Sequence, residues 1–411
     1  MFYLPLVPVA FIQHGKNRNN PMNTAEILFW IFFTIVLYTF FGYGIIVFIL
    51  VKIKHAIWPK KVAYDATFLP DITLIVPSYN EADFILEKVE NSKSLDYPKD
   101  KLHILFITDG SDDGTYEKIK DIEGITVMHT PERGGKSGAM NRAMKEVTTE
   151  FVVFCDANTI LNTEALREIV KHYQDPKTGA VACEKRIIQK DKENASSAGE
   201  GLYWKYESFL KKYDSDLYTT AGAAGELMSC RTNLYQHLEP DTLLDDFMLT
   251  MRIAEKGYRI VYEPQAYAME TASMSVKEEL KRKVRICAGG WQSIMRLGNL
   301  LNPFYNLPLW FIYVSRKVLR WSLTPLCMLL LLPLNILLVL DGNIFYILLL
   351  LGQIAFYSAA ALGWYFENKK MKFKAFFVPY YFFIMNYSVF AGFIRFIRKR
   401  QSVRWERAKR A

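Results

Sequence analysis

The sequence predicts an α/β domain with a mainly parallel sheet, joined to an α-helical transmembrane region. Short hydrophobic runs at 72–77, 102–108 and 151–155 each end in a cluster of polar residues. Ligands of open α/β sheets bind just beyond the carboxyl ends of parallel strands, so the clusters indicate one shared crevice. Uncharged segments long enough to cross a bilayer lie on both sides of this region.

Strand and helix signals alternate between about residues 70 and 270. We expect strands at 72–77, 102–108, 125–129, 151–155, 180–184 and 259–262. We expect helices at about 82–94, 136–147, 163–173, 197–212 and 246–256. This alternation is typical of a mainly parallel sheet that is covered by helices on both faces.

The N-terminal apolar segment, residues 27–51, contains no charged side chain. Its length predicts a transmembrane helix rather than a cleavable signal. Basic residues follow it at positions 52, 54, 55, 60 and 61. The positive-inside rule therefore places the following domain in the cytoplasm, although Lys16 and Arg18 precede the segment.

The C-terminal part of the chain also has the composition of a membrane region. Residues 276–297 and 303–321 mix basic with apolar or aromatic side chains, which suits helices at a membrane surface. Segments 322–340 and 344–366 flank a polar turn and predict a transmembrane hairpin. A last apolar segment, 375–394, leads into a basic tail.

The formal net charge of +9 is concentrated at the C-terminus. Residues 395–411 hold eight Lys or Arg and one Glu, so +7 lies there and +2 on the rest of the chain. A basic tail directly after an apolar segment favours a cytoplasmic membrane-facing anchor over a nucleic-acid-binding arm. A cytoplasmic tail requires the 375–394 segment to be interfacial or re-entrant if every other apolar segment crosses. The five cysteines lack metal-site spacing and are expected to be buried thiols.

Two glycine-containing motifs could bind a nucleotide. Asp109-Gly110-Ser111 follows a predicted buried strand, where Asp109 could accept hydrogen bonds from a base or ribose; an ordinary turn is the alternative. Arg133-Gly134-Gly135-Lys136 precedes a predicted helix, and basic side chains at a helix N-terminus favour an anion. A solvated loop is the alternative here, and the spacing is not that of a P-loop.

Two further motifs carry carboxylates. Asp156-Ala157-Asn158 follows a predicted buried strand and offers two oxygen ligands for Mg²⁺ or Mn²⁺, or else a helix cap. Asp245-Asp246 begins a predicted helix, either as a capping pair or with one carboxylate acting as general base on a hydroxyl. No Gly-x-Ser-x-Gly motif supports a serine hydrolase.

The order of these motifs resembles that of the membrane-embedded, inverting family 2 glycosyltransferases, which include hyaluronan, poly-N-acetylglucosamine and cellulose synthases. The resemblance covers about residues 70–300 in detail and implies a Rossmann-like glycosyltransferase-A fold. The donor-binding residues that it implies are Pro77, Tyr79, Glu81, Asp109, Arg133, Lys136 and Asp156. It further implies a metal site at Asp156 and Asn158, a catalytic base at Asp246 beside Asp245, and an acceptor-side loop from Gly225 to Arg231.

The chain departs from the family pattern at two places. Asn158 stands where the family has a second Asp, so we expect weaker metal binding. The Gln-x-x-Arg-Trp box of processive synthases appears here as residues 282–286, which keep Arg285 but lack the Gln and the Trp. We place Arg285 and Trp291, five residues after the box, on the acceptor or diphosphate side together with Gly225.

The resemblance implies transfer of a sugar, with inversion, from a nucleotide sugar to a glycan acceptor, with uridine diphosphate as the expected nucleotide. We expect polysaccharide synthesis coupled to membrane extrusion. The alternatives are transfer of a single sugar to a polyprenyl lipid or lipid-linked oligosaccharide, and an inactive membrane scaffold subunit. The expected cofactor is Mg²⁺ or Mn²⁺, and the expected partners include membrane lipids but no nucleic acid. The oligomeric state stays open.

These expectations divide the chain into six parts. They are an N-terminal segment (1–26), a transmembrane helix (27–51), a cytoplasmic catalytic domain (65–275), interfacial amphipathic helices (276–321), a C-terminal transmembrane region (322–397) and a basic tail (398–411). We place the protein in the plasma membrane, which is the inner membrane in a bacterium.

Overall fold

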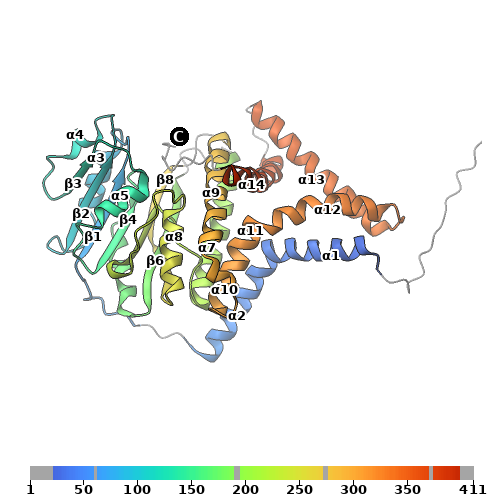
Figure 1. The fold of residues 1–411 in the computed structure, drawn as a ribbon, viewed down its shortest axis with the longest axis horizontal. Helices are drawn as coiled ribbons and strands as arrows, with labels where there is room; N and C mark the ends of the chain where they lie inside the picture. The colour runs from blue at the N-terminus through green and yellow to red at the C-terminus, as the bar shows by residue number, and fades with distance from the viewer. Residues whose placement is uncertain (1–21, 60–62, 189–194, 272–275, 370–373, 399–411) are drawn as a thin grey trace, which may run out of the picture.

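The computed structural model describes residues 22–59, 63–188, 195–271, 276–369 and 374–398. It has an α/β domain at one end, from which a group of long helices extends (Figure 1). Most of the predicted N-terminal segment and nearly all of the basic tail lie outside the described residues. The position of the tail relative to the membrane therefore stays a prediction.

One eight-stranded sheet forms the centre of the α/β domain, with the strand order β3-β2-β1-β4-β7-β6-β8-β5. Its strands are β1 (Ile72–Ser78), β2 (Leu102–Asp109), β3 (Thr126–Thr130), β4 (Phe151–Cys155), β5 (Ile160–Leu161), β6 (Thr178–Ile188), β7 (Leu227–Arg231) and β8 (Arg259–Thr271). Strands β1 to β4 are parallel, and so are β6 and β8. The prediction of a mainly parallel sheet is confirmed, with β5 and β7 antiparallel to their neighbours.

Helices cover both faces of the sheet, because the central strands are apolar on both sides. Every residue of β1 and β4 is buried. Side chains of β1 alternate between two hydrophobic clusters, with Leu74 in one and Ile75 in the other. The first cluster packs under α3 (Ile85–Lys93), α4 (Thr115–Ile119) and α6 (Ala165–Val170), and the second under α5 (Gly135–Ala143) and α8 (Asp245–Glu255). Short 3₁₀ turns occur at Lys171–Gln174, Thr232–Leu234 and Gly298–Leu301.

The prediction of an acceptor-side loop at 225–231 is wrong for most of its length. Residues Leu227–Arg231 form β7, which lies between β4 and β6. Its first four residues are buried, because they are short or apolar side chains that fit between two neighbouring strands. Only Gly225 and Glu226 remain outside the strand.

The remaining helices form the membrane-like region and its connection to the sheet. They are α1 (Thr24–Leu37), a π-helical turn (Tyr38–Gly42), α2 (Tyr43–Ile57), α7 (Ala195–Leu217), α9 (Val276–Arg296), α10 (Leu307–Tyr313), a second π-helical turn (Val314–Val318), α11 (Leu319–Trp321), α12 (Leu323–Val339), α13 (Ile344–Asn368) and α14 (Lys374–Ile397). The helices predicted at 322–340 and 344–366 are confirmed as α12 and α13. The Asn343 side chain caps α13 by accepting a hydrogen bond from the Phe345 amide.

Within the described residues, three helices are long and apolar enough to cross a membrane. They are Thr24–Ile57, Ile344–Asn368 and Ala375–Ile397. A fourth candidate is the pair Leu307–Trp321 and Leu323–Val339, which is bent by 51° at its break.

Buried ion pairs join α7 to these helices. Arg316 Nη2 lies 3.0 Å from Glu207 Oε2, and Arg316 Nε lies 3.0 Å from Asp214 Oδ2. Tyr43 from α2 donates a hydrogen bond of 2.5 Å to Asp214 Oδ1. The side chains of all three charged residues are at most 5% exposed, so these charges are compensated by one another rather than by water.

Helix α9 lies between the α/β domain and α14 (Figure 1). On one side, a β-carbon at Gly392 of α14 would lie 2.6 Å from Cys287 Cβ. On the other side, a β-carbon at Gly289 would lie 2.6 Å from Leu244 Cγ. The helix prediction for 276–297 is confirmed, but both neighbours approach its backbone closely.

Candidate active site

The polar ends of β4, α5 and α8 meet at one point. Lys136, in the first turn of α5, places its Nζ 2.7 Å from Asp156 Oδ1 and 3.4 Å from Asp245 Oδ2. Asp156 directly follows β4, and Asp245 is the first residue of α8. The predicted anion site, metal site and carboxylate pair are therefore parts of one cluster.

Gly225 completes this cluster. Its carbonyl oxygen lies 3.5 Å from Lys136 Nζ. A β-carbon at this position would lie 2.9 Å from Lys136 Nζ and 3.3 Å from Asp246 Oδ2. The predicted acceptor-side position thus touches both the cation and the expected base.

The charges in the cluster shift one another's pKa values. Burial raises the pKa of Asp246 from its ordinary value of 3.8 to about 7, and the neighbouring Asp245 carboxylate acts in the same direction. Burial alone would lower the pKa of Lys136, but Asp156, Asp245 and Asp246 outweigh it and raise that pKa. Lys136 is therefore a permanent cation, and Asp246 is a carboxyl group that can exchange a proton near neutral pH.

Asp109 supports the loop that carries Lys136. Its carboxylate accepts hydrogen bonds from the amides of Gly134, at 3.1 Å, and Gly135, at 2.6 Å. It also pairs with the Arg142 guanidinium, and its side chain is only 4% exposed. Asp109 thus holds the start of α5 in place. Arg142 was not predicted as a site residue, because in the sequence it is only one basic residue within a predicted helix.

The other predicted donor residues lie at the end of β1 and in the loop between β3 and α5. The guanidinium carbon of Arg133 lies 3.6 Å from the centre of the Tyr79 ring, which is a close cation–π contact. Gly110 allows this approach, because its φ is +68° and a β-carbon would lie 2.9 Å from Arg133 Cβ. Pro77 is buried inside β1 opposite Ile107, and Glu81 is 3% exposed at the turn before α3.

The chemistry of the Asp156 and Asn158 side chains fits a divalent cation. A carboxylate and an amide oxygen are hard oxygen ligands of the kind that Mg²⁺ and Mn²⁺ take. Lys136, rather than a third acidic side chain, stands beside Asp156. In the described part of the chain, no group of three or more His, Cys, Asp or Glu residues is placed to hold a metal, so a cation here would need ligands from a bound diphosphate or water.

Arg285 and Trp291, the two site residues predicted on α9, lie on different faces of this helix. Arg285 precedes Gly289 by four residues, so both lie on the helix face that is turned to Leu243 and Leu244. The ring of Trp291 packs against Phe393 of α14, with ring centres 4.6 Å apart. This contact does not locate an acceptor, so the place of Trp291 on the acceptor side stays a prediction. The contact with α14 could not be expected from the apolar character of Trp291 alone.

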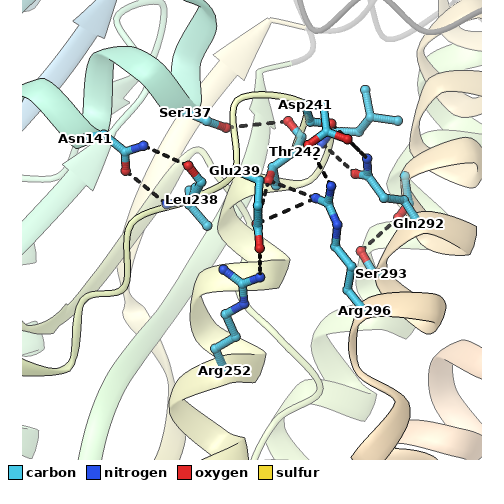
Figure 2. A network of polar contacts seen from close by, with 12 residues as sticks. Ser137, Asn141, Leu238, Glu239, Asp241, Thr242, Arg252, Gln292, Ser293 and Arg296 are labelled. Carbon is cyan, nitrogen blue, oxygen red and sulfur yellow. Dashed lines mark hydrogen bonds and ion pairs between the residues drawn. The ribbon is translucent and has the colours of Figure 1, made fainter.

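A polar network holds the segment that leads into Asp245, as Figure 2 shows. Gln292 and Arg296 of α9 contact this segment from one side. Ser137 and Asn141 of α5 contact it from the other, with Asn141 Nδ2 donating to the Leu238 carbonyl at 2.8 Å. These side chains were not predicted from the sequence, because each contact joins positions about 50 to 105 residues apart.

Residues 73–238 match the family model described as glycosyl transferase family 2. This stretch is a glycosyl transferase family 2 domain. The recognition made from the order of the motifs is therefore confirmed. The family 2 domain, as matched, includes the residues of the donor motifs but ends seven residues before Asp245.

The curated relatives of this chain include poly-beta-1,6-N-acetyl-D-glucosamine synthases. Over 248 residues the chain is 29% identical to the poly-beta-1,6-N-acetyl-D-glucosamine synthase of Staphylococcus aureus strain MSSA476, covering 58% of each protein. Over 278 residues it is 24% identical to the enzyme of the same name from Staphylococcus epidermidis, covering 65% of this chain and 66% of that one. The chain thus spans a little over half the length of the first of these relatives.

Among solved structures, a mannosyltransferase from Pyrobaculum calidifontis, in complex with GDP-Man and Mn²⁺, matches with a TM-score of 0.68. The two chains are 24% identical, and the match covers 91% of this chain and all of the other. The family 2 domain and its adjoining apolar helices therefore share a known overall fold. The predicted fold class, a glycosyltransferase-A-like domain with a helical region, is confirmed.

Proposed function

We propose that the protein transfers a sugar from a nucleotide sugar to a hydroxyl group of a glycan acceptor, with inversion at the anomeric carbon. The observation that carries this proposal is Asp246, a buried carboxyl group whose pKa is raised to about 7, next to the Lys136–Asp156 ion pair. A base with this pKa suits deprotonation of a hydroxyl at neutral pH.

In the proposed step, Asp246 removes the proton of the acceptor hydroxyl as its oxygen forms a bond to the anomeric carbon. The bond from that carbon to the diphosphate oxygen breaks, and its electron pair leaves with the nucleoside diphosphate. Lys136 and Arg133 would bind the diphosphate and offset its negative charge. A single displacement of this kind inverts the configuration of the sugar carbon.

We propose Asp156 and Asn158 as the protein ligands of Mg²⁺ or Mn²⁺. A bound divalent cation would supply further positive charge beside the diphosphate. The nucleotide site would be shaped by Pro77, Tyr79, Glu81 and Asp109. Two of these residues would act indirectly, because Asp109 holds the 133–136 loop and Glu81 lies buried at the strand end. Arg285 and Gly225 belong to the acceptor or diphosphate side in this proposal.

The acceptor that we propose is a growing polysaccharide, and the donor is a uridine diphosphate sugar. The names of the staphylococcal relatives support a polysaccharide product. The long apolar helices support a membrane location. We propose that residues 65–275 form a catalytic domain on its cytoplasmic side, because basic residues follow the first apolar segment. We propose α9 to α11, within 276–321, as the part at the membrane surface, followed by membrane-spanning helices up to 397 and the basic tail.

A second candidate function is transfer of one sugar to a polyprenyl lipid or a lipid-linked oligosaccharide. Two observations favour it. The box at 282–286 lacks its Gln and Trp, and Trp291, which could replace that Trp, packs against Phe393 of α14.

The test uses the full chain, purified and reconstituted in lipid. It is incubated with Mn²⁺ and a panel of uridine and guanosine diphosphate sugars, and released nucleoside diphosphate is measured. The proposal expects release with at least one donor and its loss in Asp246→Asn. The matched control Asp121→Asn changes an exposed carboxylate and should behave as wild type. Product length on a gel separates polymer from single-sugar transfer, and absence of release with every donor would contradict the enzymatic proposal.

A further inference from the structure

We infer that Gln292 of α9 is a positioning residue for the Asp245–Asp246 pair, and that α9 thereby connects this pair to α14. The inference rests on the proposed function, in which Asp246 is the base. It concerns a residue outside the matched family 2 domain, on a helix that contacts both the 238–244 segment and the C-terminal apolar helix.

Both polar atoms of the Gln292 side chain are used. Its Oε1 accepts a hydrogen bond of 3.0 Å from the Leu243 amide, and its Nε2 donates one of 2.8 Å to the Asp241 carbonyl oxygen. The side chain is 7% exposed, so water does not replace these bonds readily. Gln292 therefore fixes the main chain of the 238–244 segment two residues before Asp245.

Ion pairs surround this contact, as Figure 2 shows. Arg296 lies one turn after Gln292 and reaches Asp241 Oδ1 at 2.6 Å and Thr242 Oγ1 at 3.1 Å. Arg252, on α8 itself, pairs with Glu239 at the start of the segment. Arg296 also lies 3.7 Å from Glu239, so the 238–244 segment is held to both α8 and α9 at Glu239 and to α9 from Asp241 to Leu243.

The packing beside Gln292 leaves no room for the segment to slide along α9. A β-carbon at Gly289 would lie 2.6 Å from Leu244 Cγ and 3.0 Å from Leu243 Cβ. The two leucines therefore lie directly on the helix backbone. A displacement of α9 must be accompanied by a displacement of Leu244, the residue before Asp245.

The opposite side of α9 contacts α14 just as closely. The ring of Trp291 packs against that of Phe393 at an angle of 43°, and Cys287 Sγ lies 3.5 Å from Ser388 Oγ. A β-carbon at Gly392 would lie 2.6 Å from Cys287 Cβ. Since α9 is one unbroken helix of 21 residues, a shift of α14 reaches the catalytic pair through a rigid element.

The first test replaces Gln292 in the reconstituted full chain. Gln292→Glu keeps the shape and still accepts from the Leu243 amide, but its second oxygen faces the Asp241 carbonyl and cannot donate to it. We expect kcat to fall about 10- to 100-fold, because misplacement of a catalytic group by about 1 Å costs about that much. The donor KM and the affinity for the free nucleoside diphosphate should change less than about twofold, because the donor residues lie on other elements.

A readout independent of turnover is hydrogen exchange at the Leu243 amide. Gln292→Leu, which removes both hydrogen bonds, should accelerate exchange of peptides that contain residue 243 while leaving peptides from β1 and β4 unchanged. The matched control is Asn299→Ala, which removes a 3.0 Å hydrogen bond to Glu255 at the other end of α8. This control should retain wild-type kcat.

The outcomes separate the inference from the function on which it rests. If the wild-type protein is active and folded Gln292→Glu has the same kcat, the positioning role alone is overturned. The same holds if Gln292→Glu changes only the thermal stability. A wild-type protein that releases no nucleoside diphosphate would contradict the proposed function and this inference together.

The connection to α14 has its own test. Gly392→Ala should lower kcat without raising the donor KM, because the added methyl group must displace α9 or α14. An unchanged kcat in this variant would overturn the connection to α14 and leave the role of Gln292 in place.

Discussion

Gly225 lies directly against Lys136, with its carbonyl oxygen 3.5 Å from Lys136 Nζ. The glycine therefore occupies the point where the cation, Asp156 and the Asp245–Asp246 pair converge. The contact depends on the absence of a side chain, since a β-carbon would come within 2.9 Å of the ammonium group. The position of Lys136 relative to the carboxylates is thus set partly by the turn before β7.

We expect Gly225→Ala to reduce kcat about tenfold while leaving thermal stability nearly unchanged. The added methyl group displaces the end of a flexible lysine side chain, which costs little folding free energy but moves the cation away from its carboxylates. Steady-state kinetics and thermal unfolding measure the two effects. Gly298→Ala is the control, because no atom lies within 4 Å of the new β-carbon. Equal kinetics in both variants would show that the close approach at 225 has no catalytic consequence.

Asp246→Asn should reduce transfer by about 10²- to 10⁴-fold, the usual effect of removing a general base. Donor binding should persist, because Lys136 and Asp156 are unchanged. Calorimetry with uridine diphosphate, beside the release assay, tests both statements. Turnover within a few-fold of wild type would exclude Asp246 as the base.

Activity should rise with pH through about 7, because Asp246 must be ionised to accept a proton and its pKa is raised to about 7. The raised pKa also means that the folded state holds this proton more tightly than the unfolded state does. The contribution of Asp246 to the free energy of unfolding therefore falls as the pH rises from 3.8, the ordinary pKa of an Asp, to about 7, its pKa in the folded protein.

A profile of kcat against pH checks this expectation, with Asp245→Asn as the comparison. Removing the second carboxylate should shift the acidic limb to lower pH, because Asp245 helps to raise the pKa of Asp246. An acidic limb that stays at the same pH in Asp245→Asn would assign it to another group.

Activity should require a divalent cation, and Asn158→Asp should lower the concentration of Mg²⁺ or Mn²⁺ needed for half-maximal activity. The substitution adds a carboxylate to an oxygen-ligand site and strengthens its attraction for the cation. Metal titrations of chelator-treated protein compare the two chains. Full activity in excess chelator would remove the metal assignment.

If α9 lies at the membrane surface, its neighbouring residues 294 and 295 should differ in labelling. Met295 is 71% exposed and Ile294 is 6% exposed. In a background without native cysteines, Met295→Cys should react with a water-soluble maleimide faster in detergent than in lipid, where the bilayer surface protects it. Ile294→Cys should stay unreactive until the protein unfolds. Equal labelling of Met295→Cys in lipid and in detergent would argue against a surface location.

Local patterns in the sequence were sufficient for the parallel half of the sheet. The runs at 72–77 and 151–155 are continuous apolar stretches, and β1 and β4 occupy them within one residue. Their polar ends were correctly expected to share one edge, because parallel strands end on the same side. The sequence also indicated that Lys136, Asp156 and Asp245 belong together.

The rest depends on contacts between distant positions. β7 has only five residues and inserts antiparallel between β4 and β6, so its pattern alone does not distinguish it from a loop. The Arg142–Asp109 pair and the Gln292 contacts join residues 33 and 49 positions apart. Periodicity describes one element at a time and contains no information about such partners, which is also why the contact of Trp291 with Phe393 was not predicted.

The buried ion pairs between α7 and Arg316 determine where this protein can be divided. A fragment that ends before α10 would lack Arg316, the cation that pairs with Glu207 and Asp214 in the full chain. Loss of one partner from a buried pair typically costs about 3–5 kcal/mol, which is a large share of the stability of a domain. We therefore expect the α/β domain to be less stable when it is expressed without the helical region that supplies Arg316.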